Sequence, residues 1–139
     1  MPKQILSTKG APTAVGPYSQ GVVAGGFLYT SGAIPLDPAT GEVVGKTAAE
    51  QAVRCMKNLE AVLAAGGCTF ADVVKTTLYL VNLADFQTVN QEYAKFFTAA
   101  PPARSTVEVK GLVKGVLVEI DMTALVPEKP FVPTPNDVR

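Results

Sequence analysis

Arg104 is the residue whose type and setting point most directly to a ligand. It follows residues 101–103, Pro-Pro-Ala, at the start of a β-type segment, where a loop delivers its side chain to a sheet. A planar guanidinium group matches a carboxylate with two parallel hydrogen bonds. The alternative is an ion pair at the rim of the protein with Glu108 or Glu119. The sequence therefore offers either a carboxylate-binding site or a surface ion pair at this position.

Glu119 is the second candidate, because it interrupts the apolar run of residues 116–120. A carboxylate in such a place can position or deprotonate a water molecule, as carboxylates do in general acid–base catalysis. It can equally lie on the solvent-facing side of an alternating strand. Asp121, two residues further on, is as consistent with solvent as with a site.

Four further polar positions could line a pocket. Tyr18 lies in a loop of residues 16–21 that glycine and proline restrict, and its ring either faces a ligand or packs on the core. Ser31 and Gly32 leave a strand with a hydroxyl and a free backbone N–H, which suits a turn or a small anion. Asn90 is an amide on an otherwise apolar helical stripe, where it either binds a ligand or fixes a loop.

The composition excludes several kinds of chemistry. The sequence has no histidine, which removes histidine triads, histidine general bases and histidine metal ligands. Its two cysteines, Cys55 and Cys68, are not closely spaced and have no evident base, so they indicate neither a metal site nor a nucleophile. We therefore expect a site without metal, built from Arg, carboxylates, hydroxyls, backbone groups and water.

Charge and hydropathy restrict the partners. The chain has 12 basic and 12 acidic residues and no basic block, so nucleic acid is not an expected partner. No segment approaches the ~20 apolar residues of a membrane span, and the first ten residues do not form a secretory signal. Two cysteines without a disulfide framework favour a cytoplasmic location. Charged residues make up only 17% of the chain, which favours a homo-oligomer that hides apolar surface.

Hydrophobic periodicity and turn residues predict alternating strands and helices. Thr47 and Glu50 form a capping box ahead of a helical apolar stripe, and a Gly-Gly pair ends that helix. The predicted elements are two strands around Gly25-Gly26 within residues 22–30, a helix from Thr47 to Gly66, a strand at 73–81, a helix capped by Asp85 that runs to about Phe97, and strands at 104–109 and 117–126, with room for one more strand before the first helix.

This order predicts an α+β fold in which two helices pack on one face of a mixed sheet. Strand alternation places Arg104, Thr106 and Glu108 on one face of their strand. The last two strands read as neighbours joined by a turn at residues 110–115, and the register decides whether Arg104 and Glu119 share a face. Residues 1–126 form a single domain, and residues 127–139 form a proline-rich tail.

Several segments together resemble one family, the RidA/YjgF reactive-intermediate deaminases. The resemblance runs from about Ile5 to Leu125, and its most specific part is residues 102–109, Pro-Ala-Arg-Ser-Thr-Val-Glu-Val, with the later Val-Glu-Ile at 118–120. Ala33 stands where many relatives carry glutamine, a departure that touches only pocket detail. The other matching segments are residues 16–20, 30–32, 34–35, 41–43, 74–77 and 85–86, and Asn90.

The resemblance implies a chorismate-mutase-like (YjgF-like) fold and a homotrimer with clefts between its subunits. It implies a 2-iminobutanoate/2-iminopropanoate deaminase, a hydrolase that converts small imines and enamines such as 2-aminoacrylate to 2-oxo acids and ammonia without a cofactor. Free imines hydrolyse readily, so positioning and modest proton transfer suffice. By position, Arg104 would bind the substrate carboxylate with backbone around Thr106 and Gly32, Glu119 would hold the attacking water, and Tyr18, Ser31 and Asn90 would line the cleft.

Two other functions compete with deamination. A non-catalytic regulatory trimer could use the same cleft to bind a small ligand, although the presence of Arg104 favours catalysis. A ribonuclease is the least favoured, because the chain has no histidine and no net positive charge.

Overall fold

The computed structural model describes residues 2–128 of the chain, so most of the predicted tail lies outside it. The α-helices and strands, with short 3-10 turns between some of them, follow in the order β1 (Gln4–Leu6), β2 (Gly21–Ala24), β3 (Phe27–Thr30), α1 (Ala48–Ala65), β4 (Val73–Leu80), α2 (Phe86–Ala94), β5 (Ala103–Glu108) and β6 (Val118–Leu125).

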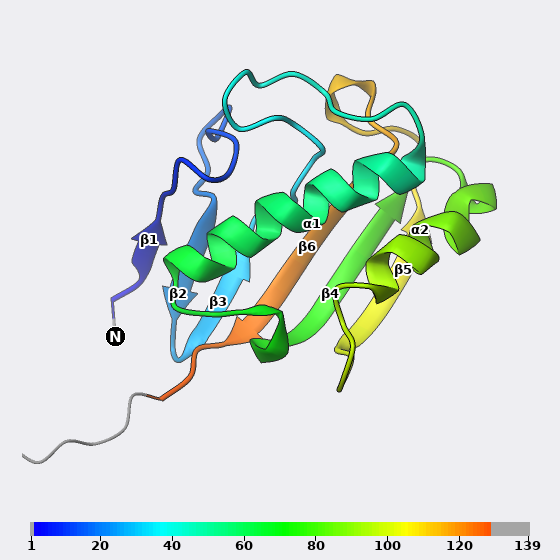
Figure 1. Ribbon diagram of the computed structural model, residues 1–139. Helices are drawn as coiled ribbons and strands as arrows, with labels where there is room; N and C mark the ends of the chain where they lie inside the picture. Colours follow the sequence, from blue (N-terminus) through cyan, green and yellow to red (C-terminus); the bar gives the residue numbers. More distant parts are fainter. Residues whose placement is uncertain (1, 129–139) are drawn as a thin grey trace, which may run out of the picture.

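These strands form one mixed six-stranded sheet in the order β1-β2-β3-β6-β4-β5. The β4–β5 pair is parallel, and the other pairs are antiparallel. Figure 1 shows α1 and α2 together on one face of this sheet, with α1 crossing it diagonally. The predicted arrangement of two helices on one face of a mixed sheet is confirmed.

Local signals produced the first elements as expected. Gly25 and Gly26 both take positive φ, which the tight turn between β2 and β3 requires and which glycine adopts without strain. The Thr47 side chain accepts a hydrogen bond from the Glu50 N–H and begins α1. The helix ends at Ala65, directly before the predicted Gly-Gly stop.

The second helix differs from its prediction at both ends. Asp85 makes no side-chain capping bond, because it has αR backbone angles and belongs to a 3-10 turn that leads directly into α2. The Asn82 side chain caps that turn instead, accepting a hydrogen bond from the Ala84 N–H. The helix ends at Ala94 rather than near Phe97, and the following amides bond three residues back.

The last two strands are not neighbours, so the expectation of an adjacent pair is wrong. β4 lies between β5 and β6, and it pairs in parallel with β5 and antiparallel with β6. The additional strand is β1, at the N-terminal end rather than directly before α1, where the structure has only two isolated bridges, Ala33 with Ile120 and Leu36 with Val43.

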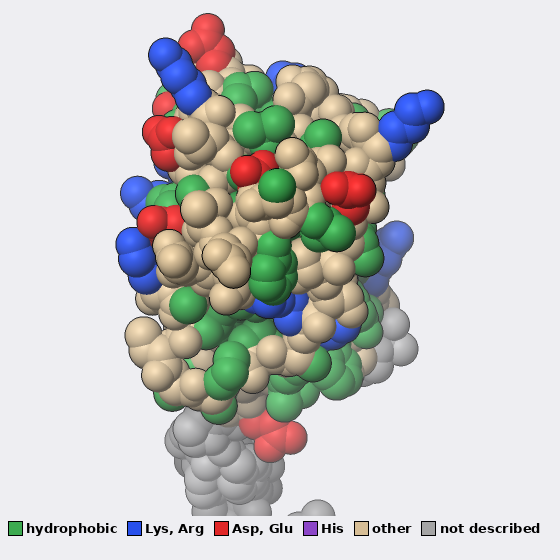
Figure 2. Space-filling model, turned by 90° about the vertical axis from the view of Figure 1, so that its right-hand side faces the viewer, with side chains coloured by type: hydrophobic (Ala, Val, Ile, Leu, Met, Phe, Trp, Pro, Cys, Tyr) green, Lys and Arg blue, Asp and Glu red, His purple; other side chains and the backbone are tan. Residues whose placement is uncertain are grey.

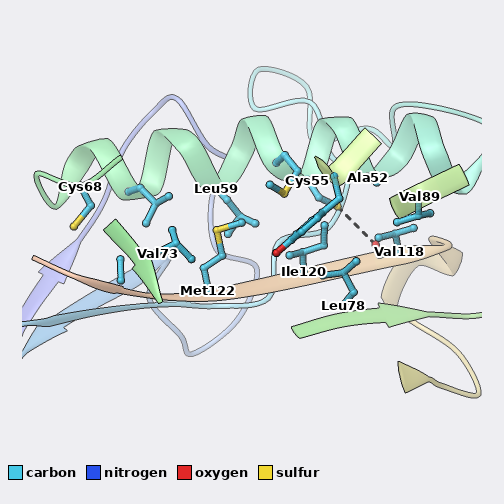
Figure 3. Close-up of a cluster of buried hydrophobic side chains, with 14 of the residues drawn as sticks. Ala52, Cys55, Leu59, Cys68, Val73, Leu78, Val89, Val118, Ile120 and Met122 are labelled. Atoms are coloured by element: carbon cyan, nitrogen blue, oxygen red, sulfur yellow. Dashed lines mark hydrogen bonds between the residues drawn. The ribbon is translucent and has the colours of Figure 1, made fainter. Parts of the chain in front are cut away.

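The core lies between α1 and the sheet (Figure 3). Leu59 and Met56 of α1 belong to this core together with Ile120 and Met122 of β6, and all four are almost fully buried. The inward residues of β6 alternate with half-exposed ones. This alternation sends Glu119 to the face of the sheet that the helices leave uncovered.

Candidate active site in two halves

Arg104 lies at the start of the edge strand β5, and its guanidinium group is held by α2. Its Nη1 donates to Asn90 Oδ1 at 2.7 Å. Its Cζ lies 4.9 Å from the centre of the Tyr93 ring and 5.6 Å from that of Phe86. The aromatic faces attract the cation, and the amide fixes the direction of one N–H.

The spacing of these residues in α2 explains the arrangement. Positions 86, 90 and 93 are four and three residues apart, so their side chains lie along one stripe of the helix. Tyr93 is anchored in turn by a 2.8 Å hydrogen bond between its hydroxyl and that of the buried Thr76. Thr76 pairs with Arg104 in the sheet, which ties the helix stripe to the strand.

Arg104 makes no ion pair within residues 2–128, where the single salt bridge joins Lys95 to Glu92. Glu108, one of its proposed partners, instead accepts a hydrogen bond from the Leu83 N–H. The other, Glu119, lies two strands away. The surface ion-pair alternative for Arg104 is therefore wrong, and its remaining donors have no carboxylate from the described chain. We name Arg104, Asn90, Phe86, Tyr93 and Thr106 the Arg104 cluster.

Thr106 lies on the same face of β5, two residues after Arg104. Its hydroxyl oxygen is buried and has no hydrogen-bond partner among the described residues. Figure 2 views the molecule from the side that carries α2 and β5, where basic side chains lie beside hydrophobic ones. This edge combines a positive group with apolar and neutral surroundings, which suits an anionic ligand of small size.

Glu119 belongs to a second, separate region. It lines a cavity of about 340 Å³, which we name the Glu119 pocket. Gly32 lies so close to Glu119 that a Cβ at position 32 would overlap the carboxylate. The lining residues are Val15, Tyr18, Ser31, Gly32, Ile34, Val113, Lys114 and Glu119.

The surroundings of Glu119 make its carboxyl group easier to protonate than that of an ordinary glutamate. Burial raises the pKa of its carboxyl, and the nearby charge of Asp121 raises the pKa further. Asp121 itself accepts a 2.9 Å hydrogen bond from the Tyr79 hydroxyl. Burial and this bond raise the pKa of Tyr79, so the phenol stays protonated as a donor. A carboxyl with a raised pKa can exchange a proton nearer to neutral pH than an ordinary glutamate.

Tyr18 and Ser31 shape the pocket through the loop that they share. Tyr18 is half exposed, and its hydroxyl oxygen accepts a hydrogen bond from the Val15 N–H at 3.2 Å. Ser31 Oγ donates to the Ser19 carbonyl at 2.5 Å, so this hydroxyl fixes the loop. Gln20 holds the same segment with bonds to the backbone of Thr8 and Pro12. The predicted positions are thus at a pocket, although Ser31 uses its side chain within the protein.

The two regions lie on opposite faces of the sheet in one chain. Arg104 pairs with Thr76, which pairs with Met122, and these inward positions face the helices. Glu119 alternates with the inward residues of β6 and faces the other way. The structure therefore brings Arg104, Asn90 and Thr106 together, and separately Tyr18, Ser31, Gly32 and Glu119. A single chain does not unite its two predicted catalytic residues.

The cysteines add no further chemistry to either region. Cys55 is buried, burial raises the pKa of its thiol, and its Sγ lies 3.8 Å from the Val118 carbonyl oxygen (Figure 3). Burial also raises the pKa of the Cys68 thiol. Within residues 2–128 no cluster of three or more metal-ligating side chains occurs. No helix of the described chain is long and apolar enough to cross a membrane.

Fold and site together define a class of small α+β proteins that present an arginine and a carboxylate on separate faces of one sheet. Comparison with known sequences identifies the family. The family model described as Endoribonuclease L-PSP matches residues 8–126, and the chain belongs to this family, which includes the RidA/YjgF proteins.

Individual relatives cover nearly the whole domain. The chain is 51% identical to a RutC family protein of Saccharolobus solfataricus over 88% of this chain and 97% of the relative. It is 42% identical to the human 2-iminobutanoate/2-iminopropanoate deaminase over 88% of this chain and 90% of the relative.

Solved structures agree with the fold. The Escherichia coli YjgF product superimposes with a TM-score of 0.84 at 46% identity, and E. coli TdcF with bound serine does so with 0.84 at 40%. Each covers 88% of this chain and 98% of its own.

Sequence reasoning missed part of each region. Phe86 and Tyr93 share the helical stripe of Asn90, and the apolar pattern alone does not predict that their rings flank the Arg104 guanidinium. The amide of Asn90 on that stripe was the available signal, because an amide among apolar residues needs a polar partner. Val113 and Lys114 carried no pattern that would connect them to Glu119. Only the tertiary structure places their loop beside the pocket.

Proposed function

We propose that this protein hydrolyses small 2-imino acids, and the enamines that give rise to them, to 2-oxo acids and ammonia. The supporting observation is Arg104, a half-buried guanidinium that is fixed by α2 and has no acidic partner among the described residues. A fixed cation of this kind can bind the carboxylate common to all 2-imino acids. Membership in a family with an imine deaminase supports the same reaction.

The complete site in this proposal forms between two copies of the chain. One copy contributes the Arg104 cluster and the next contributes the Glu119 pocket, because one chain holds them on opposite sheet faces. Closed assembly of such head-to-tail contacts gives a ring, and we propose a homotrimer.

The uncovered face of the sheet supports this assembly. Phe27, Tyr29, Val107 and Leu125 all point to that face and remain exposed, Tyr29 to 48% and Leu125 to 50%. Apolar side chains gathered on one sheet face mark an interface. Light scattering should give about three times 14.5 kDa, and a monomer with full activity would overturn the intersubunit site.

The residues then have distinct roles in the reaction. Arg104 holds the substrate carboxylate and thereby orients the C=N carbon. Glu119 accepts a proton from water as the water oxygen bonds to that carbon. A proton delivered to nitrogen then allows the C–N bond to break, with release of ammonia and formation of the 2-oxo acid. The raised pKa of Glu119 suits both proton transfers.

A coupled assay tests the activity. An amino-acid oxidase generates imines from several amino acids, and appearance of the 2-oxo acid is timed with this protein, without it, and with the Arg104→Ala variant. We expect the wild type to accelerate 2-oxo acid formation and the variant to give little more than the spontaneous rate. Tight binding of 2-oxo acids without acceleration of any imine would instead support the regulatory alternative.

A parallel incubation with single-stranded RNA tests the activity named in the family description. Zero net charge and the absence of histidine lead us to expect no cleavage above background. Cleavage that the Glu119→Gln variant loses would overturn the deaminase proposal in favour of a nuclease.

A further inference from the structure

The Glu119 pocket is much larger and more apolar than the smallest imino acids require. Its volume is about 340 Å³. Sites for drug-sized ligands occupy about 300–1,000 Å³. A substrate with a methyl side chain, as in 2-iminopropanoate, would fill only part of this space, which the Arg104 cluster of the next copy also faces in the proposed ring.

The lining residues of the pocket include a polar set, which we name the polar end, and an aliphatic set, which we name the apolar end. Ser31, Gly32 and Glu119 form the polar end. Val15, Ile34 and Val113 supply aliphatic walls, and Val15 and Val113 are each 63% exposed in the single chain. Branched aliphatic side chains left this open to water gain most from covering by another apolar group.

The apolar space continues inward from these walls. An adjacent cavity of about 50 Å³ shares Val15, Tyr18, Ser31, Gly32 and Ile34 with the pocket, and its other lining residues include the buried Leu59 and Val62 of α1. The Ile34 carbonyl accepts a hydrogen bond from the buried Asn58 side chain, which holds this wall in place. The apolar end is therefore a supported part of the fold.

We propose that Val15, Ile34 and Val113 form a subsite for the substrate side chain. Its preferred occupants are branched aliphatic chains, such as that of the imine derived from leucine. This inference rests on the proposed deaminase function, in which Glu119 at the polar end acts on the C=N carbon. The one cationic lining residue within the described chain, Lys114, donates to the Gly41 carbonyl at 3.3 Å, and the glutamate-derived imine therefore serves as the competing substrate in the test.

Paired substrates test the subsite. Hydrolysis of imines generated from alanine, leucine and glutamate is compared as kcat/KM. Extra methylene groups in an apolar pocket typically discriminate about tenfold or more, so we expect the leucine-derived imine to exceed the alanine-derived one by roughly 10- to 100-fold. Equal rates for alanine and leucine, or a preference for the glutamate-derived imine, would overturn the subsite.

A substitution of Val113 tests whether the aliphatic lining of the pocket causes the preference for the leucine-derived imine. Val113→Phe fills the apolar end, and we expect it to lower the leucine-to-alanine ratio by about tenfold. A ratio is insensitive to the fraction of active protein, so partial misfolding does not imitate this result. Ile5→Phe makes a matched control, because Ile5 is 53% exposed on β1 and does not line the pocket. An unchanged leucine-to-alanine ratio in the Val113→Phe variant would show that Val113 does not contact the substrate side chain, and would overturn the subsite.

A binding measurement separates this inference from the deaminase proposal. Calorimetry compares pyruvate with 4-methyl-2-oxopentanoate, the 2-oxo acids that correspond to alanine and leucine. Tighter binding of the branched acid without hydrolysis of any imine would retain the subsite and refute the deaminase. Hydrolysis with no preference for the branched acid would refute the subsite alone, and binding of neither acid without hydrolysis would refute both.

Discussion

The Arg104 cluster and the Glu119 pocket solve different problems of recognition. Arg104 is held within one chain by an amide and two aromatic rings, so its direction is fixed before any ligand arrives. Glu119 lines an open cavity with exposed aliphatic walls and has a raised pKa. The first region offers a rigid charge, and the second offers space and a transferable proton. In the proposed function, binding and proton transfer therefore fall to separate faces of the sheet, and assembly of two copies would join them.

Mixing two inactive variants makes the strongest test of this division. Arg104→Ala and Glu119→Gln should each be nearly inactive. After exchange of subunits in equal amounts, about a quarter of the clefts in a ring would contain Arg104 from one variant and Glu119 from the other. We expect activity to return to a corresponding fraction of the wild type.

The control for this mixture is each variant exchanged with itself, which should stay inactive. No recovery in a mixture that light scattering shows to have exchanged subunits would mean that the two residues do not act across an interface.

Glu119→Gln should slow turnover by about 100-fold or more with little effect on ligand binding, because general acid–base groups act in the transition state.

The Glu119→Gln variant should also be more stable than the wild type at neutral pH. A carboxyl whose folded pKa is raised binds protons more readily when folded, so its stability contribution falls as pH rises through the pKa. Thermal unfolding at pH 7 and at pH 4 measures this, and the gain should shrink at the lower pH.

Arg104→Lys keeps the charge but loses the planar fork. A charge-assisted hydrogen bond contributes roughly 1.5–3 kcal/mol, so kcat/KM should fall about 10- to 100-fold. Arg104→Ala should lose more and should no longer bind 2-oxo acids. Steady-state kinetics and melting temperature are measured together. Near-equal rates for the wild type and the Arg104→Lys variant would refute carboxylate binding by the guanidinium group.

Phe86→Leu tests whether the aromatic rings position Arg104. A cation–π contact is worth about 0.5–2 kcal/mol, which corresponds to roughly 2- to 30-fold in kcat/KM. The loss should appear mainly in KM, because the ring acts by fixing the group that binds the carboxylate. Leu83→Ala is the control, because Leu83 is an exposed apolar side chain three residues earlier and lies outside the Arg104 cluster. If Phe86→Leu and Leu83→Ala change KM equally, Phe86 contributes to packing and does not position Arg104.

Asp121→Asn should have the smallest effect, visible mainly in the pH profile. Burial is the first cause of the raised pKa of Glu119 and the charge of Asp121 is the second, so its removal lowers that pKa in part. If turnover needs the Glu119 carboxylate, the acid limb of kcat/KM should move to lower pH. Glu60→Gln, an exposed substitution on α1, should leave the limb in place. If the acid limb of kcat/KM stays in place in the Asp121→Asn variant, that limb does not report the pKa of Glu119.

Local patterns along the chain determine much of the fold. Gly25-Gly26 specifies a hairpin because the turn needs positive φ, and Thr47 specifies a helix start because its oxygen satisfies a free N–H. Period-two alternation places Arg104 with Thr106 and turns Glu119 away from its apolar neighbours. These features depend on residues a few positions apart, and a sequence carries them directly.

Long-range pairing is what the tertiary structure alone decided. The sequence predicts adjacent strands around Arg104 and Glu119, because the hydrophobic pattern of a strand does not determine which strand it pairs with. In the structure, β4 lies between them. That insertion, together with the alternation of each strand, fixes Arg104 on the helix side and Glu119 on the uncovered side. The sequence by itself determined which residues could bind a carboxylate and move a proton. The order of the strands decided that one chain keeps those residues apart, because side chains on opposite faces of a sheet cannot meet through it.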